Sequence, residues 1–577
     1  MSKKILLIPT ILLLVLFVWS GCHTEIGEDV SSSTDSDNST GTIKDDPSDY
    51  VWDNSQVIGI TLKNSTASVS GSGATVSGSL VTITAPGTYG ISGSLTNGQI
   101  VVNSAVDGVV RLILNGATIS CSNNAPIFVM DAEKVVINLA ASSVNSLTDG
   151  ASYNTSDEPN AALYSKSNLT IFGEGSLVVN ASYNDGITSK DGLIIDSGNI
   201  TVNAKDDGIR GKDYLLVKSG TITVKAGGDG LKSDNDSNAA CGYINILKGT
   251  FAITSSGDAI SAETAVNITD GKFDIVTGVG SSALITSSKG IKGNTKLIIE
   301  TGNYKITSTD DALHANTRMT INSGTFSLSS GDDGIHADSA LVINGGNINI
   351  TKCYEGIESA IITINNGTIH LISSDDGINA AGGGGGAMVP GGGGMPPGQG
   401  GTTTASKYFL YMNGGYVYVD ALGDGIDING SVMMTSGTLI VNGPTANDNG
   451  ALDYDGTFQM SGGTLVAAGS SGMAMAPGSN STINSLQLTL KSTQLANTLV
   501  NVQTSDGKEL LTFAPSRKFQ SVVFSSSTLV KGSSYKVYYG GSSTGSVQDG
   551  IYKNGTYTPG TQNAGFSVSS YVTKVSL

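Results

Sequence analysis

The chain has 577 residues, of which 77 are glycine, 12 are proline and only 14% are charged. Isoleucine and valine are spread evenly along it, which excludes a disordered composition and predicts many short strands joined by glycine turns. The formal net charge of −17 argues against nucleic acid as a partner and is compatible with the binding of divalent cations.

The first 22 residues predict an export signal. Lys3 and Lys4 precede an apolar run from Ile5 to Trp19, and the segment ends in Ser-Gly-Cys at Cys22. This order resembles a bacterial lipobox, whose cysteine is lipidated, although Trp19 stands where leucine is usual. We therefore expect an extracellular, cell-envelope lipoprotein with its lipid on Cys22. Ordinary secretion and an uncleaved N-terminal anchor are the alternatives.

The rest of the chain divides by composition into three parts. Residues 23–50 are rich in serine, threonine and aspartate without an apolar period, so we expect a solvated tether. Residues 51–481 carry a repeat, interrupted by a glycine-rich stretch at 381–401 that we interpret as a surface loop. Residues 482–577 predict a small C-terminal β module that covers the last repeat.

The repeat has a period of about 22 residues. Glycine or alanine fills a fixed position after an acidic residue, and Gly186, Gly208 and Gly230 follow one another at intervals of 22. Each unit also contains three short apolar segments separated by glycine or polar bends. A unit of this length is too short for a propeller blade. It predicts an all-β parallel β-helix with three strands per coil, in which inward side chains pack against the next coil.

The residue before this glycine position is acidic in nine of the ten units from Asp185 to Asp424. Equivalent residues of neighbouring coils stack about 4.8 Å apart. Two carboxylates at that distance repel by about 3–4 kcal/mol at an effective dielectric near 20. The row therefore needs protons, cations or backbone donors, and Ca²⁺ is a cation that prefers oxygen ligands.

Some units double the acid, and these units are our candidate calcium sites. A single aspartate before glycine is ordinary turn capping, which is the alternative interpretation, but capping needs only one acid per turn. The candidate ligands form a first, a second and a weaker third group: Asp206, Asp207 and Asp229; Asp310, Asp311, Asp332 and Asp333; Asp149 and Glu158.

Basic and aromatic residues accompany the acidic row, and we predict that they contact a glycan. We expect His314 and His336 to be exposed, on the same side as Asp310 and Asp332 four residues upstream. Surface charge balance is the alternative role for the basic residues, and filling a turn is the alternative for the tyrosines. The candidate glycan ligands are Arg210, Lys232, Lys292, His314, His336, Tyr183 and Tyr354.

Several segments resemble a family of bacterial carbohydrate-binding-domain proteins. The resemblance is carried by "GTYGISGSLTNGQIVV", "VRLILNGATISCSNNAPIFV", "DGITSKDGLIIDSGNITVNAKDDGIRGKD" and "FAPSRKFQSVVFSSSTLVKGSSYKVYYGG". It implies a right-handed parallel β-helix, similar to that of family 9 pectate lyases, that binds Ca²⁺ and acidic or cellulosic plant polysaccharide.

Three functions follow from these observations. We favour a non-catalytic, Ca²⁺-dependent polysaccharide-binding protein on the cell surface, monomeric and attached to the membrane only through its lipid. The second is a polysaccharide lyase, in which Ca²⁺ acidifies a uronate proton and Lys232 or Arg210 removes it. The third is a structural or adhesive solenoid that binds no glycan.

Overall fold

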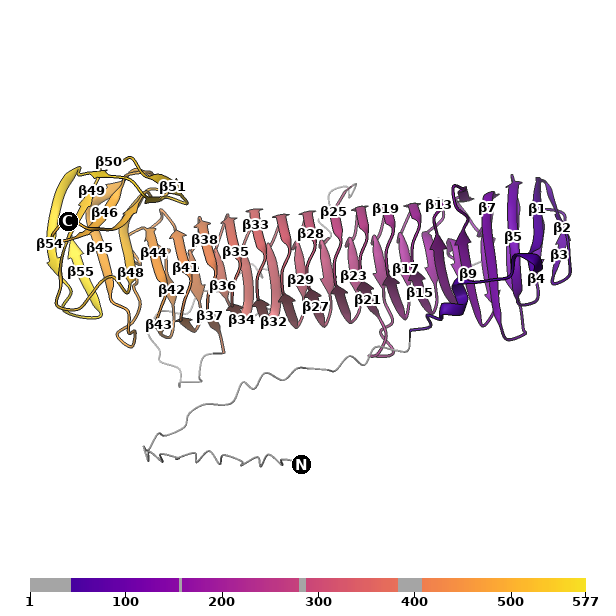
Figure 1. The fold of residues 1–577 in the computed structure, drawn as a ribbon, viewed down its shortest axis with the longest axis horizontal. Coiled ribbons are helices and arrows are strands. Elements are labelled where there is room, and N and C mark those ends of the chain that lie inside the picture. Colours follow the sequence, from indigo (N-terminus) through magenta and orange to yellow (C-terminus); the bar gives the residue numbers. More distant parts are fainter. Residues whose placement is uncertain (1–42, 155–157, 280–286, 382–406) are drawn as a thin grey trace, which may run out of the picture. The chain divides into compact units, whose positions relative to one another are not determined.

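The protein is built almost entirely of β-strands (Figure 1). This computed structural model describes residues 43–154, 158–279, 287–381 and 407–577. Within them, the helical elements are two short 3₁₀ turns, η1 (Pro47–Tyr50) and η2 (Asn54–Gln56), and no helix has the length and apolar character needed to span a bilayer. The predicted export signal, Cys22, residues 23–42 of the tether and residues 382–401 of the glycine-rich loop lie outside the described residues.

The strands form one long, mainly parallel sheet in which most strands pair with the strand three places later. We call the three resulting series A, B and C, in the order in which one repeat unit contains them. Series A begins after the acidic turn, series B follows it, and a glycine bend leads to series C. The predicted all-β class and long parallel sheet are confirmed.

Series A comprises β4 (Leu80–Ile83), β6 (Gln99–Asn103), β8 (Ile127–Asp131), β11 (Ala161–Ser165), β14 (Asp185–Ser189), β17 (Ile209–Gly211), β20 (Leu231–Ser233), β23 (Ile260–Ala262), β26 (Ile291–Gly293), β29 (Leu313–Ala315), the first parts of β32 (Ile335–Ile343) and β34 (Ile357–Ile364), β36 (Ile378–Ala380), β39 (Ile426–Ile428) and β42 (Asp453–Tyr454). Series B comprises β9 (Lys134–Leu139), β12 (Asn168–Gly173), β15 (Gly192–Ile195), β18 (Tyr214–Val217), β21 (Tyr243–Ile246), β24 (Ala265–Ile268), β27 (Lys296–Ile299), β30 (Arg318–Ile321), the second parts of β32 and β34, β37 (Phe409–Met412), β40 (Ser431–Met434) and β43 (Phe458–Met460).

Series C comprises β10 (Val144–Asp149), β13 (Ser176–Ala181), β16 (Asn199–Ala204), β19 (Thr221–Ala226), β22 (Thr250–Ser255), β25 (Lys272–Val276), β28 (Asn303–Thr307), β31 (Thr325–Ser329), β33 (Asn347–Lys352), β35 (Thr368–Ser373), β38 (Tyr416–Ala421), β41 (Thr438–Asn442) and β44 (Thr464–Gly469). The long strands β1 (Ile58–Asn64), β5 (Gly87–Leu95) and β7 (Val109–Cys121) precede them and continue their parallel pairing.

Both ends of the parallel sheet are closed by antiparallel strands. At the N-terminal end, β2 (Thr66–Val69) pairs with β1, and β3 (Ala74–Ser77) pairs with β4. At the C-terminal end, β44 pairs with β48 (Phe519–Ser526), which in turn pairs with β45 (Ser485–Gln494). The backbone groups of these terminal strands therefore find partners instead of presenting an open edge.

The remaining C-terminal strands build a module on this end. β55 (Val572–Ser576) adds to β45, and β50 (Ser542–Ser543) pairs with β53 (Tyr557–Thr558). The strands of a separate six-stranded sheet are β46 (Val500–Thr504), β47 (Glu509–Phe513), β49 (Ser534–Tyr539), β51 (Ser546–Gln548), β52 (Ile551–Lys553) and β54 (Thr561–Ser567).

The core consists of rows of identical or similar side chains. The residues that follow the glycine position in series A, such as Ile187, Ile209 and Leu231, are fully buried. In series C, the rings of Phe251, Phe273, Tyr304 and Phe326 form a continuous stack with centroids 4.6–4.8 Å apart. The spacing follows from parallel register, which puts each ring directly over its equivalent in the next unit.

Residues 43–50 differ from the solvated tether that we expected to reach residue 50. Ile43 packs on the cluster of Tyr214 and Tyr243, and Lys218 Nζ lies 3.0 Å from Asp45 Oδ2. The ring of Tyr50 meets that of Phe172 edge-on at 5.0 Å. Apolar and charged contacts with series B therefore hold this segment, so any tether ends before residue 43.

We expect the core ring stack to be a main source of stability. Replacing Phe273, which is 1% exposed, with alanine should lower the free energy of unfolding by about 3–5 kcal/mol, because a buried ring leaves a cavity. The matched control is Leu247→Ala, an apolar residue that is 46% exposed and should change stability by less than about 0.5 kcal/mol. Urea unfolding followed by circular dichroism would measure the free energy of unfolding of both variants. An equal loss in the two would contradict a main role of the ring stack in stability.

Candidate functional site

The acidic row is a structural ladder between neighbouring units. The Oδ1 atom of Asp207 accepts the backbone N–H of Asp229, which is the equivalent residue one unit later, at 2.9 Å. Asp311 Oδ1 accepts from Asp333 N in the same way at 3.0 Å, and Asp376 Oδ1 from Asp424 N at 2.6 Å. Each of these carboxylates therefore caps a backbone N–H of the following unit and not one in its own turn. The second oxygen, Oδ2, stays available for other partners.

The partner of Oδ2 is usually the side chain three residues later in the same unit. Asp311 Oδ2 lies 2.7 Å from His314 Nδ1, and Asp333 Oδ2 lies 2.7 Å from His336 Nδ1. Asp229 Oδ2 pairs with Lys232 at 2.9 Å. The repeated Asp-Gly/Ala-Ile/Leu-His pattern therefore has a direct physical meaning, since it joins an acid of the row to the imidazole three residues later.

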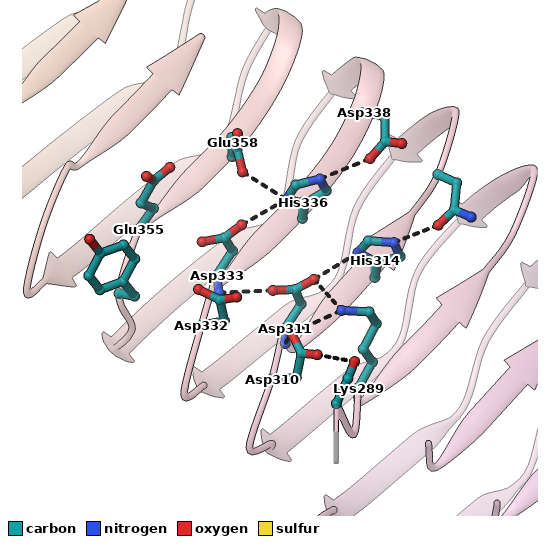
Figure 2. Close-up of a pocket in the computed structure, with 13 residues that line it drawn as sticks. Lys289, Asp310, Asp311, His314, Asp332, Asp333, His336, Asp338, Glu355 and Glu358 are labelled. Carbon is teal, nitrogen blue, oxygen red and sulfur yellow. Dashed lines mark hydrogen bonds and ion pairs between the residues drawn. The ribbon is translucent and has the colours of Figure 1, made fainter. Parts of the chain in front are cut away.

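The second predicted acidic group lines a pocket of about 540 Å³ beside β29, β32 and β34 (Figure 2). Seven carboxylates face three basic side chains in it. The acids are Asp310, Asp311, Asp332, Asp333, Asp338, Glu355 and Glu358, and the bases are Lys289, His314 and His336.

The two histidines are not exposed, which corrects our expectation from the sequence. Only 11% of the His314 side chain and 13% of the His336 side chain are accessible, and their rings stack at 4.9 Å. Their carboxylate partners are Asp311 and Asp333, three residues upstream, instead of the acids four residues upstream. The tight bend at the glycine position turns the preceding carboxylate toward the ring, so simple alternation of sides does not apply.

The electrostatics of the pocket are dominated by burial and by neighbouring charges. Lys289 Nζ bridges Asp310 and Asp311 at 2.9 and 2.8 Å. Burial raises the pKa of Asp333, and it raises the pKa of Glu355 to about 7. Although burial opposes its charge, hydrogen bonds to Asp333 and Glu358 raise the pKa of His336. The pocket therefore has more carboxylates than its own bases can neutralise.

The first predicted group is already occupied by a protein cation. Lys232 Nζ lies 3.0 Å from Asp207 Oδ2 and 2.9 Å from Asp229 Oδ2. Arg210 pairs with Asp234 at 2.8 Å. Among the described residues, Asp310, Asp311 and Asp332 form a group of three ligand atoms within 4.8 Å of one another, whereas the first group forms no such set.

The third predicted group is not brought together around a common point. Asp149 is buried and accepts a hydrogen bond from Tyr153 at 2.8 Å. Glu158 pairs instead with Lys166 at 3.2 Å and with Lys190 at 3.0 Å. The two acids therefore have separate partners, a tyrosine hydroxyl for Asp149 and two lysines for Glu158.

The other predicted glycan ligands differ in their surroundings. Tyr183 stacks on Tyr153 with ring centroids 4.1 Å apart. Tyr354 is 44% exposed and lines the pocket, in the turn that follows Asp332 by one unit. Lys292 lies in register with His314 on the neighbouring strand. Tyr354 is thus the candidate whose ring is most open at the pocket.

A further acidic group escaped our sequence interpretation. Ligand atoms of Asp376, Asp424 and Asp427 lie within 4.8 Å of one another. Burial raises the pKa of Asp376 to about 8 and that of Asp424 to about 6. The acidic row does continue to both residues, but the 48-residue interval between Gly377 and Gly425 hides the fact that their units are adjacent.

Comparison with known proteins supports a carbohydrate-binding family. Residues 77–334 match the family model described as "Carbohydrate-binding domain-containing protein". A curated protein of that description from Acetivibrio thermocellus is 43% identical over 136 residues, and the match covers 23% of this chain and 48% of that protein. This chain therefore spans about half the length of that relative.

A solved structure is also similar in sequence. It is the polysaccharide lyase-like protein from C. thermocellum, determined as a gadolinium derivative. The identity is 37%, the match covers 38% of this chain and 91% of that chain, and the TM-score is 0.38.

The buried acid Asp185 generates a prediction about pH. Burial, followed by the nearby charge of Asp207, raises its pKa to about 7, above the unfolded value of about 3.9. A raised carboxyl pKa adds stability that is fully present below about pH 4 and is lost as the pH rises through about 7. Between these pH values, the free energy of unfolding should therefore fall less in Asp185→Asn than in the parent protein.

Thermal or urea unfolding at pH 4, 6 and 8 in a chelating buffer would measure this difference, which should be on the order of a few kcal/mol at the alkaline end. Asp274→Asn is a matched control, because the Asp274 side chain is 56% exposed and pairs only at the surface with Lys305. Parallel pH profiles for the parent and Asp185→Asn would contradict the prediction.

Proposed function

We propose that this protein is a non-catalytic, cell-surface polysaccharide-binding protein that uses Ca²⁺ to recognise acidic, pectin-like or other plant cell-wall glycans. The family match of residues 77–334 supports the polysaccharide partner. The observation that carries the calcium part is the group formed by Asp310, Asp311 and Asp332, whose carboxylate oxygens come from two neighbouring units. Oxygen ligands of this kind suit Ca²⁺, which binds them at about 2.3–2.6 Å.

The proposed role of Ca²⁺ is to reverse the local charge of the pocket. A uronate carboxylate would be repelled by seven acids, whereas a divalent ion between Asp310 and Asp332 would attract it. Ca²⁺ would take the place of Lys289 between Asp310 and Asp311. The released ammonium group would then be free to meet a glycan oxygen. The exposed ring of Tyr354 could stack on a sugar at the rim.

The same proposal includes the finer architecture and the location of the protein. We propose that series A, B and C close into a right-handed coil of three strands, like that of family 9 pectate lyases. The chain would be a monomer attached to the outer face of the cell envelope through a lipid on Cys22. The clear separation of an apolar segment from a polar stretch at residues 23–42 supports this arrangement.

The local chemistry argues against Lys232 and Arg210 as the base of a lyase. A base must be able to lose its proton. Although burial opposes the charge of Lys232, Asp229 and Asp207 raise its pKa, and hydrogen bonding to Asp234 likewise raises the pKa of Arg210. Both side chains are therefore held in the protonated state by the acids that they neutralise.

We expect the pocket acids to control calcium and glycan binding together. The double variant Asp310→Asn, Asp332→Asn should lose bound Ca²⁺ and weaken binding of polygalacturonate by about tenfold or more, which corresponds to about 1.4 kcal/mol. Calcium is measured by plasma emission, and glycan affinity by gel electrophoresis with and without chelator. Asp274→Asn serves as the surface control. Binding of polygalacturonate that resists both chelator and the double variant would contradict the calcium part, and no glycan binding at all would favour a structural solenoid.

We also expect no cleavage of polygalacturonate in the presence of Ca²⁺. β-Elimination produces an unsaturated uronate that absorbs in the ultraviolet, so a continuous absorbance assay detects it. A rise in absorbance that is abolished by Lys232→Ala but kept in Lys305→Ala, a surface lysine, would overturn the proposal in favour of the lyase.

A further inference from the structure

His336 presents one ring nitrogen to two carboxylates at the same time. Nδ1 lies 2.7 Å from Asp333 Oδ2 and 2.9 Å from Glu358 Oε2, while Nε2 lies 3.0 Å from Asp338 Oδ1 (Figure 2). The three acids come from the turn before β32, from β34 and from β32 itself. His314 differs, since its Nδ1 lies 2.7 Å from Asp311 and its Nε2 lies 2.7 Å from the amide oxygen of Asn316.

The hydrogen-bonding capacity of His336 does not match these neighbours in the neutral state. A neutral imidazole has one N–H group, and ionised carboxylates only accept hydrogen bonds. If Nε2–H donates to Asp338, the Nδ1 lone pair points at two acceptor oxygens at contact distance. A cation must therefore lie between these atoms, either a proton on the ring or on a carboxyl, or a metal ion.

We propose that Asp333, His336 and Glu358 bind a divalent transition-metal ion of the zinc class. An imidazole nitrogen with two carboxylates is a ligand set that suits Zn²⁺, whereas Ca²⁺ prefers oxygen alone. Asp338 completes the arrangement, because histidine ligands of metals typically donate their other ring N–H to a carboxylate that fixes the tautomer. Three protein ligands leave a tetrahedral ion one position for water or for a ligand oxygen.

The observed distances require only a small adjustment. Ligand atoms around a tetrahedral ion with bonds of about 2.1 Å stand about 3.4 Å apart, so each carboxylate oxygen would move away from Nδ1 by roughly 0.5–0.7 Å. Glu358 has a longer side chain on a separate strand and can make this movement by rotation. The charge of the pocket favours it, since seven carboxylates face three basic groups.

This site is separate from the calcium group under the proposed function. Asp310, Asp311 and Asp332 supply only oxygen atoms and share no residue with Asp333, His336 and Glu358. The pocket would therefore bind Ca²⁺ through oxygen ligands alone and Zn²⁺ through a ring nitrogen with two carboxylates. Either ion could be lost without the other.

The test uses the full chain produced without a polyhistidine tag, stripped with a chelator and then dialysed against Zn²⁺ and Ca²⁺ together. Plasma emission should find Zn²⁺ retained by the parent and lost from His336→Gln. Co²⁺ provides a second readout, because its visible ligand-field bands change when a ring nitrogen coordinates it. The matched control is His370→Gln, whose ring pairs with Asp549 far along the chain and which should retain Zn²⁺.

Circular dichroism would show whether His336→Gln folds. If it does not, two further variants keep the test decisive. Glu358→Gln should also lose Zn²⁺, and Asp338→Asn should weaken Zn²⁺ binding by about tenfold or more through the loss of the fixed tautomer. The variant Asp310→Asn, Asp332→Asn should lose Ca²⁺ and keep Zn²⁺, which separates this inference from the proposed function. A parent that retains only Ca²⁺ would show that a proton fills the position. Zn²⁺ retention unchanged in His336→Gln and Glu358→Gln would show that Zn²⁺ binds at other residues. Either result would overturn the inference.

Discussion

Series A depends on one hydrogen bond, in which the backbone N–H of one unit donates to the aspartate carboxylate of the unit before it. It recurs from Asp207 to Asp229, from Asp311 to Asp333 and from Asp376 to Asp424. Because Oδ1 must reach a main-chain N–H one unit away, the carboxylate is drawn into the bend and loses its water. Stacking therefore forces a row of acids to be buried at a spacing where they repel one another.

The same constraint explains why basic side chains lie along the row. One oxygen of each capping acid is committed to the backbone, so its charge is balanced through Oδ2. Lys232 Nζ contacts two acids at once, and the rings of His314 and His336 contact the acids of their own units. Where acids are doubled, these partners no longer suffice, and the pocket is left with more carboxylates than basic groups.

The residues that join neighbouring units and the residues that line the pocket therefore belong to one set. Asp310 is half-buried and Asp332 is exposed, and both line the pocket. A capping acid such as Asp311 cannot be removed so freely, because its Oδ1 accepts the backbone N–H of Asp333 while its Oδ2 lies against His314.

The sequence by itself determined the all-β class, the period of the units and the acidic row, because parallel stacking repeats the same demands every 22 residues. It also identified the doubled acids of the pocket. Only the tertiary structure decided which cation faces each acid. The bend at the glycine position, and not strand alternation, directs Asp311 and Asp333 toward the histidines. The adjacency of Asp376 and Asp424 follows from the pairing of β36 with β39, whose residues are 48 positions apart in the sequence. The fold of residues 43–50 on series B likewise depends on contacts with Tyr214, distant in the sequence.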